Sequence, residues 1–192
     1  MNISFGKKIP IAKCQIQNLT TGRFEPATIF ELDCKDESDL LEVVKPSREW
    51  EYAAYIHSNM CDKVDLQKIF GNDDTDRFYI LQNKYGETLG MSQVEEIYDG
   101  AYDLAYLDTK KDKQYKYVGQ TLLATVAREV FKKAGDSFSV YGAVDSAIKF
   151  YEKVCGFQLG DLGMPYLPWD EIPKFIKQTE KRTQSQIIDL KG

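Results

Sequence analysis

Alternating apolar and polar residues recur in the first part of the chain, and this period of two is the pattern of β-strands with one covered face. Segments 11–17 and 24–34 alternate in this way on either side of the turn-rich sequence NLTTGR, so they predict a β-hairpin. A second hairpin is predicted for 77–83 and 88–100 around the turn KYGE, and residues 101–109 follow as a further strand.

Two helices are predicted between these hairpins. Residues 36–44 begin with acidic side chains, which stabilise the positive end of a helix dipole. Pro46 is expected to end this helix because it lacks a backbone N–H. Residues 47–60 then predict a second helix with Ser47 as its N-cap, and the sequence LQKIFG at 66–71 predicts a separate helical turn.

The period changes to that of a helix in the second half of the chain. From Gly119 until Gly135, apolar residues recur at spacings of three and four: Leu122, Leu123, Val126, Ala127, Val130 and Phe131. A strand is predicted at 137–144, and the Pro-punctuated segment 163–175 leads into a final amphipathic helix. The last residues, 179–192, are polar, and we expect them to fray.

A short amphipathic helix is predicted over 147–155. Asp145 and Ser146 offer N-cap oxygens at its start, and Gly156 stands where a left-handed C-cap is favoured. Tyr151 lies in the middle of this helix. The simplest interpretation makes it a core aromatic with its hydroxyl at the rim, and a chemical role for the hydroxyl is the alternative.

The order of these elements predicts one α/β domain with a mixed sheet. A chain of 192 residues is long enough for one well-buried core and too short for two large domains. Within this single domain we distinguish an N-terminal hairpin (1–35) and a C-terminal extension (163–192).

Composition and charge limit the classes of function. With 43% hydrophobic and 12% aromatic residues the chain is globular, and no apolar run has the length of a membrane span. The net charge of −5 argues against holding nucleic acid by bulk charge, although the basic stretch 109–117 leaves a local patch open. The N-terminus lacks the continuous apolar core of a signal peptide, so we expect a cytoplasmic protein and leave a homodimer open.

Metal and thiol chemistry have few candidate residues. The four cysteines are scattered without a C-x-x-C pair, and His57 is the one histidine of the chain. A zinc site or a cysteine–histidine nucleophile pair therefore has little to build on. We expect reduced, buried cysteines, no resident metal and no catalytic role for His57.

The segment after residue 109 is the first candidate site. A strand leads through KKDKQYKYVGQTLL into a helix with Gly119 near its start. A helix entered in this way directs unpaired N–H groups and the positive end of its dipole at an anion such as a phosphate. An ordinary loop-to-helix junction is the plain alternative.

Two motifs in this half of the chain resemble those of the GNAT N-acetyltransferases. The loop is similar to the family's pyrophosphate loop, Q/R-x-x-G-x-G/A, with Gln114 at its first position and Gly119 at its last. Tyr117 stands where the family has its first glycine. SAIKFYEKVCGF is similar to the helix signature A-x-x-FYEK-x-GF, with one extra residue before Gly156. The resemblance implies a mostly antiparallel central sheet flanked by helices, with the N-terminal hairpin as an addition.

The resemblance also implies a co-substrate and residues that hold it. The co-substrate is acetyl-CoA, and no metal is needed. Tyr151 becomes the candidate general acid, since a phenol with an ordinary pKa of about 10 keeps its proton at neutral pH and can protonate a leaving thiolate. The residues implied to bind the cofactor, mostly through the backbone, are Leu107, Gln114, Tyr117, Val118, Gly119, Gln120 and Thr121.

The expected reaction is acetyl transfer to a primary amine by direct attack on the thioester. The acceptor is left open between small molecules and a protein lysine or N-terminus. Carboxylates near the presumed site are candidate bases, with Glu96 and Asp103 named first and Glu95 and Asp99 beside them. The alternatives are a non-catalytic protein that binds acyl-CoA or a partner, and a toxin that acetylates a macromolecule.

The second predicted helix is rich in aromatic residues, namely Trp50, Tyr52 and Tyr55. Core packing is the simplest role for them. In the resembled family the first two helices border the acceptor site, so these residues could also shape a substrate pocket.

Overall fold

The computed structural model describes the chain from residue 8 to 191 with short gaps, in the ranges 8–33, 36–70, 76–98, 100–112, 114–133, 135, 137–141, 143–160 and 163–191. Within these ranges the helices are α1 (Glu37–Glu49), α2 (Glu51–Phe70), α3 (Val118–Phe131), α4 (Asp145–Lys149) and α5 (Ile172–Thr183). A π-helical segment, Phe150–Cys155, continues α4, and a 3₁₀ turn, Trp169–Glu171, precedes α5.

The strands are β1 (Ile9–Asn18), β2 (Phe24–Leu32), β3 (Arg77–Asn83), β4 (Thr88–Tyr98), β5 (Ala101–Thr109), β6 (Tyr115–Lys116), β7 (Ser137–Val140), β8 (Gln158–Leu159), β9 (Pro165–Pro168) and β10 (Ile188–Asp189). They form one sheet in the order β10-β1-β2-β3-β4-β5-β7-β9-β8, with β6 paired to β1 off this path. Among the described strands β5 and β7 make the only parallel pair, so the predicted mostly antiparallel sheet flanked by helices is confirmed.

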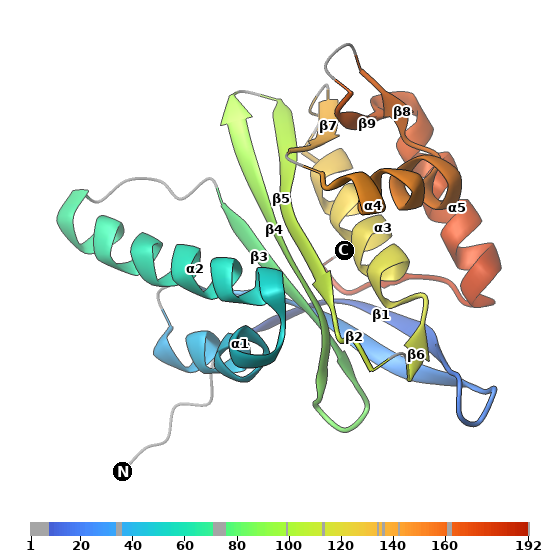
Figure 1. The fold of residues 1–192 in the computed structure, drawn as a ribbon, viewed down its shortest axis with the longest axis horizontal. Coiled ribbons are helices and arrows are strands. Elements are labelled where there is room, and N and C mark those ends of the chain that lie inside the picture. Colours follow the sequence, from blue (N-terminus) through green and yellow to red (C-terminus); the bar gives the residue numbers. More distant parts are fainter. Residues whose placement is uncertain are drawn as a thin grey trace.

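The sheet is covered on both faces. Figure 1 shows α1 and α2 on one side of it and α3 with α5 on the other. Residues of β3 alternate between two cores: Phe78 and Ile80 pack under α1 and α2, whereas Tyr79 and Leu81 belong to the larger cluster under α3. A strand buried on both faces explains why almost every residue of RFYILQN is enclosed.

The helix boundaries differ from the sequence prediction at Pro46. α1 runs through this proline to Glu49, and Ser47 is no N-cap, because its hydroxyl donates to the carbonyl oxygen of Val44 inside α1. The helix ends at Glu49. The next residue, Trp50, has an extended backbone and a side chain buried in the core. α2 then continues without interruption to Phe70, so the separate helical turn predicted at 66–71 is also wrong.

The N-terminal hairpin is an integral part of the sheet. β2 pairs antiparallel with β3 from Ala27↔Asn83 to Leu32↔Phe78. β1 adds to the edge of β2, and the predicted β-hairpin is confirmed. Residues 1–7, 34 and 35 of the predicted hairpin unit lie outside the described residues.

The C-terminal residues do not fray as expected. β10 pairs with β1 through Ala12↔Asp189 and Lys13↔Ile188. The guanidinium of Arg128 on α3 donates to the carbonyl oxygens of Ile187 at 2.8 Å and Ile11 at 3.4 Å. The segment is polar because it forms an edge strand with one side exposed to water.

The segment around α4 is also corrected. β7 ends at Val140, four residues earlier than predicted, and the chain turns into α4. The N-cap residue is Val144, with no side-chain hydrogen bond, and Asp145 lies in the first turn, so Asp145 is not the N-cap that was predicted. Gly156 does take the left-handed conformation, with φ 80° and ψ 22°.

The packing around Gly135 gives a stability test. A methyl group at Gly135 would lie 2.5 Å from the Gly100 carbonyl oxygen and under 3 Å from the rings of Trp169 and Tyr102. We expect Gly135→Ala to lower the free energy of unfolding by about 1–3 kcal/mol, or roughly 2 to 4 °C in Tm for each kcal/mol. Gly160→Ala is the matched control, because its added methyl meets its nearest atom at an ordinary 3.6 Å. Equal melting temperatures for the two variants would contradict the packing described.

Candidate active site

The site begins where two parallel strands part. β5 and β7 are paired from Ala101↔Ser137 to Leu104↔Val140, and β7 then ends while β5 continues to Thr109. Past Leu104, no described strand pairs with this edge of β5. Main-chain groups of the strand are therefore left available to a ligand at this edge.

A β-bulge in β5 lies at the same place. Gln93 pairs with Tyr106 but its neighbour Val94 pairs with Leu104, so Ala105 is the extra residue. The bulge changes the alternation of the strand. Leu104 and Leu107 both pack on the α3 side, while Tyr106 packs against α2.

A cavity of about 100 Å³ occupies the opening between the strands. Its lining carries no charged side chain among the described residues and consists of Tyr52, Leu104, Ala105, Tyr106, Leu107, Val140, Tyr141, Ala143, Val144, Ala147 and Tyr151. Tyr52 and Tyr106 approach from the α2 side, with ring centroids 6.4 Å apart. The described lining is thus uncharged, and its polar side-chain atoms are phenol hydroxyls.

Tyr151 belongs to the π-helical segment and is 5% exposed. Its ring packs against Phe150 and Phe157, with centroids 5.3 Å and 5.5 Å away. Among the described residues no group is hydrogen-bonded to its hydroxyl, which leaves that hydroxyl able to donate to a ligand. Burial raises the pKa of Tyr151 above its ordinary value, and the neighbouring Cys155 adds to the shift.

Cys155 itself is not a reactive thiol. Burial raises its pKa to about 12, with Arg182 opposing the shift. A thiol with such a pKa is almost entirely protonated at neutral pH and is a poor nucleophile.

A second cavity, of about 250 Å³, lies at the N-terminus of α3. It is lined by Leu89, Thr109, Lys110, Asp112, Tyr115, Lys116, Tyr117, Val118 and Gly119. The N-cap residue Tyr117 provides no side-chain hydrogen bond, and the first turn of α3 contains no acidic residue. The first N–H groups of α3 are therefore uncapped by side chains, and the helix dipole favours an anion beside them.

The loop before α3 is fixed by other parts of the chain. The backbone N–H of Gln114 donates to the Asp112 carboxylate at 3.0 Å, and the Gln114 carbonyl accepts from Leu19 N–H at 2.8 Å. β6 pairs with β1 through Gln17↔Lys116. Lys110 forms ion pairs of 2.5 Å with both Glu87 and Asp112.

The residues predicted to bind the cofactor separate into four groups. Tyr117, Val118 and Gly119 line the cavity at α3, whereas Leu107 lines the Tyr151 cavity. Gln114 braces the loop through its backbone. The remaining pair, Gln120 and Thr121, have buried side chains that line neither cavity; the Gln120 amide donates to Thr179 on α5.

The two cavities lie along one strand. Leu107 lines the first and Thr109 the second, and residues two apart on a strand are separated by about 7 Å. Gly119 and Phe150 are also close, because a methyl group at Gly119 would lie 3.9 Å from Cζ of Phe150. The two motifs noted in the sequence therefore meet in space.

The candidate bases are divided between the two faces of the sheet. Asp103 accepts a hydrogen bond from the Ser139 hydroxyl and lies directly opposite Glu95 on β4. Burial raises the pKa of Glu95, the charges of Asp76 and Asp103 add to the shift, and Lys63 opposes it. None of these carboxylates lines the Tyr151 cavity.

Glu96 occupies a different environment. It lies directly opposite Tyr102, which packs under α3 and whose ring is 5.5 Å from the Lys133 ammonium. It is therefore not brought together with Asp103 and Tyr151. Asp99, the fourth candidate carboxylate, lies outside the described residues.

Asp108 is a structural residue of the site that the sequence analysis missed. Its buried carboxylate accepts a hydrogen bond from the backbone N–H of Tyr52 at 2.9 Å, in the first turn of α2. This contact holds the start of α2 against β5 and positions Tyr52 at the Tyr151 cavity. The partners are 56 residues apart, so no local sequence signal could have revealed the pair.

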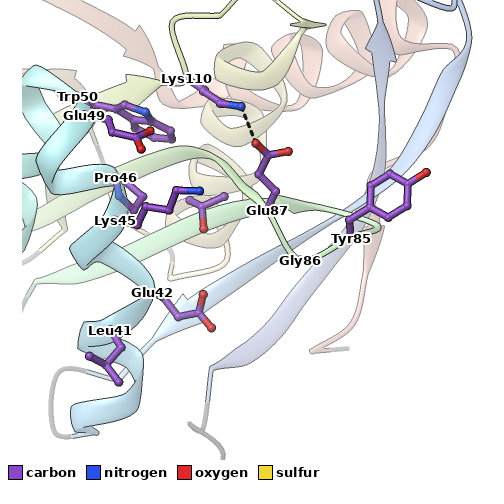
Figure 2. A pocket seen from close by; sticks show the side chains of 11 residues that line it. Leu41, Glu42, Lys45, Pro46, Glu49, Trp50, Tyr85, Gly86, Glu87 and Lys110 are labelled. Atoms are coloured by element: carbon purple, nitrogen blue, oxygen red, sulfur yellow. Dashed lines mark hydrogen bonds and ion pairs between the residues drawn. The ribbon is translucent and has the colours of Figure 1, made fainter.

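A third cavity, about 260 Å³, is separate from the Tyr151 cavity. Figure 2 shows it between α1 and the β3–β4 turn, with Trp50 and Glu49 on one wall and Lys110 reaching toward Glu87. It shares Lys110 with the cavity at α3 and no lining residue with the cavity at Tyr151. We therefore do not assign the chemistry to it.

The order of elements, the parted β5 and β7 and the uncapped α3 N-terminus define the GNAT acetyltransferase fold. A GNAT-family protein from Desulfovibrio desulfuricans is similar to the chain, with a TM-score of 0.58 at 16% identity over 74% of this chain and 99% of that chain. Spermidine N-acetyltransferase SpeG from Vibrio cholerae gives 0.56 at 16% identity, covering 76% of this chain and 95% of that one.

A third similar structure contains coenzyme A. It is the PaiA N-acetyltransferase from Thermoplasma acidophilum in complex with coenzyme A, with a TM-score of 0.50 at 20% identity over 73% of this chain and 96% of that chain. No protein-family model and no curated protein matches the sequence. At these identities the comparisons show the fold, which confirms the resemblance drawn from the two motifs at that level.

Two further findings concern the described residues alone. In that part of the chain no group of three or more histidine, cysteine, aspartate or glutamate side chains is arranged to hold a metal ion. None of the helices described there is long and apolar enough to cross a membrane.

Gly119 provides a test of the cavity at α3. A methyl group there would lie 3.3 Å from Cγ2 of Thr109, and the larger β-branched side chain of valine would narrow the cavity. We expect Gly119→Val to weaken coenzyme A binding by about tenfold or more, which corresponds to about 1.4 kcal/mol. Gly119→Ala adds only the methyl group, 3.3 Å from Cγ2 of Thr109 and 3.9 Å from Cζ of Phe150, and should bind more tightly than the valine variant. Unchanged affinity of a folded Gly119→Val protein, measured by calorimetry, would remove the assignment of this cavity to coenzyme A.

Proposed function

We propose that the protein is an N-acetyltransferase that moves an acetyl group from acetyl-CoA to a primary amine. The observation that carries the proposal is the placement of Tyr151. Its hydroxyl is without a described partner, in a cavity whose described lining is uncharged, on the strand that also leads to the uncapped N-terminus of α3. A purely structural tyrosine does not require that arrangement.

The diphosphate of acetyl-CoA would bind at the α3 N-terminus. Backbone N–H groups of Val118 and Gly119 supply donors there, and a diphosphate is the kind of anion that such a terminus stabilises. The pantetheine arm would follow β5 past Leu107, whose main chain is the part that the arm meets. The thioester would then reach the Tyr151 cavity.

The chemistry is a direct acyl transfer. The amine nitrogen attacks the thioester carbon, a C–N bond forms, and the tetrahedral oxyanion is stabilised by main-chain N–H of β5. The C–S bond then breaks, and Tyr151 donates its proton to the departing sulfur. Because the pKa of Tyr151 is raised, the phenol holds this proton throughout the physiological range.

The attacking amine must lose a proton before or during the attack. Among the described residues no carboxylate lines the cavity, so a base would act through water. Asp103 remains a candidate for this role, and Glu95 on the strand opposite is better placed than Glu96 because it shares the environment of Asp103. The pKa of Glu95 is raised from its ordinary value in the direction of neutral pH. A general base is most effective when its pKa lies near the operating pH.

The acceptor is a molecule with a primary amine, and both a small molecule and a protein lysine or N-terminus remain candidates. The structurally similar SpeG is a spermidine N-acetyltransferase, which supports a small amine as the first group to screen. Mass spectrometry of amine mixtures incubated with protein and acetyl-CoA would identify it. A toxin that acetylates a macromolecule remains an alternative. The cytoplasmic location and the homodimer stay predictions.

A non-catalytic protein that binds acyl-CoA is the second candidate function. The observation that favours it is the lack of any carboxylate among the described lining residues of the Tyr151 cavity. Binding of acetyl-CoA without transfer to any amine or to water would select this alternative.

Replacement of Tyr151 tests the acid role. Tyr151→Phe keeps the ring that packs against Phe150 and Phe157 and removes the hydroxyl. We expect nearly unchanged Tm and CoA affinity, with kcat reduced by about 10²–10⁴. Tyr79→Phe is the matched control, since Tyr79 is another buried tyrosine that lines neither cavity, and its kcat should equal that of the wild type.

The opposite result has a clear meaning. Wild-type kcat in Tyr151→Phe, at saturating substrates and with chemistry limiting the rate, would end the case for Tyr151 as the acid. Loss of Tm without loss of rate would mark it as a structural residue.

The pH dependence follows from the raised pKa. The active form of Tyr151 is the protonated phenol, so a raised pKa extends its activity upward in pH. We expect kcat/KM to rise with pH as the amine deprotonates, with no falling limb from Tyr151 below its ordinary pKa of about 10. A falling limb below that pH which disappears in Tyr151→Phe would contradict the raised pKa of Tyr151.

A further inference from the structure

Tyr117 has a backbone conformation that other side chains rarely adopt. Its φ of 72° and ψ of 4° place it in the left-handed region, and among the described non-glycine residues only Gln184 shares a positive φ. Glycine takes this conformation without steric conflict, and the GNAT motif has glycine at this position. The chain therefore keeps a strained tyrosine where a glycine would be relaxed.

The ring of Tyr117 is held in a defined place. It stacks on Phe24, at the start of β2, with centroids 6.4 Å apart and planes inclined by 8°. It also lines the 250 Å³ cavity at the N-terminus of α3. An aromatic surface is thus fixed beside the uncapped N–H groups of the helix.

A cation accompanies this ring. The ammonium of Lys116 lies 4.8 Å from the Tyr117 centroid, and the side chain is exposed. Lys116 forms no ion pair with a carboxylate in the described part of the chain, whereas Lys110, which lines the same cavity, is bound by Glu87 and Asp112. Lys116 can therefore move to a phosphate without breaking an ion pair.

The geometry points to Tyr117 and Lys116 as the binding site for the nucleotide end of coenzyme A. The purine ring stacks on the Tyr117 ring, and the ammonium of Lys116 leaves that ring to bind the phosphate on the ribose. This inference rests on the proposed function, because it requires a diphosphate at the α3 N-terminus. The adenosine is joined directly to that diphosphate, so it must lie near the N-cap residue.

If the inference is right, replacing Tyr117 by glycine changes the stability of the fold and the affinity for CoA in opposite directions. Glycine at position 117 removes the backbone strain and should leave Tm equal or higher. It also removes the stacking surface, and loss of one base–aromatic stack weakens binding by about 5- to 140-fold, from about 1–3 kcal/mol at 1.4 kcal/mol per tenfold. Phenylalanine at position 117 keeps the ring and serves as the matched control.

The experiment measures Tm and the Kd of two ligands by calorimetry for wild type, Tyr117→Gly and Tyr117→Phe. The ligands are CoA and 4′-phosphopantetheine, which lacks the nucleotide. We expect Tyr117→Gly to weaken CoA binding by the factor above and leave 4′-phosphopantetheine unchanged, with Tyr117→Phe close to wild type for both. In addition, Lys116→Met should weaken CoA more than dephospho-CoA, which lacks the ribose phosphate.

Failure of this inference can be distinguished from failure of the proposed function. CoA binding by Tyr117→Gly as tight as by wild type, or an equal loss for both ligands, would overturn the nucleotide site and leave the proposed function standing. If Lys116→Met weakens the binding of CoA and of dephospho-CoA equally, Lys116 does not belong to the nucleotide site. Absence of CoA binding by the wild-type protein would overturn the proposed function together with this inference.

Discussion

The parting of β5 from β7 after Leu104 is the constraint on which the rest of the site depends. A sheet paired along its full length would have no room for a ligand between these strands. Because β7 stops at Val140, the chain can turn into α4 and bring Tyr151 over the opening. The bulge at Ala105 completes the arrangement by directing Tyr106 to one face of β5 and Leu107 to the other.

The elements that carry the two motifs could be predicted from the sequence because their signals are local. Helical spacing in the apolar stripe of α3 and the glycine that ends the Tyr151 helix depend on neighbouring residues alone. The end of α1 could not be predicted in this way. Pro46 was expected to stop the helix, but the break follows from burial of Trp50 and from the hydrogen bond between Asp108 and α2, which is distant in sequence.

The same distinction applies to the site residues. Tyr151, Gly119 and Leu107 can be proposed from the sequence because motif positions identify them, and all three line the two cavities. The sequence alone does not reveal which of Glu95 and Glu96 shares a face of the sheet with Asp103. The strand partners decide it: Glu95 lies opposite Asp103, whereas Glu96 lies opposite Tyr102.

The pairing of β6 with β1 has a consequence for the order of folding. The loop before α3 is held by Gln17, Asn18 and Leu19, residues made almost a hundred positions earlier. Contacts between such distant segments form late, because closing a long loop opposes them with chain entropy. The loop at the N-terminus of α3 is therefore fixed only when β1 has met a segment almost a hundred residues later in the chain. A folding chain in which α3 has formed but β6 has not yet paired with β1 would have the helix before it had the rigid loop.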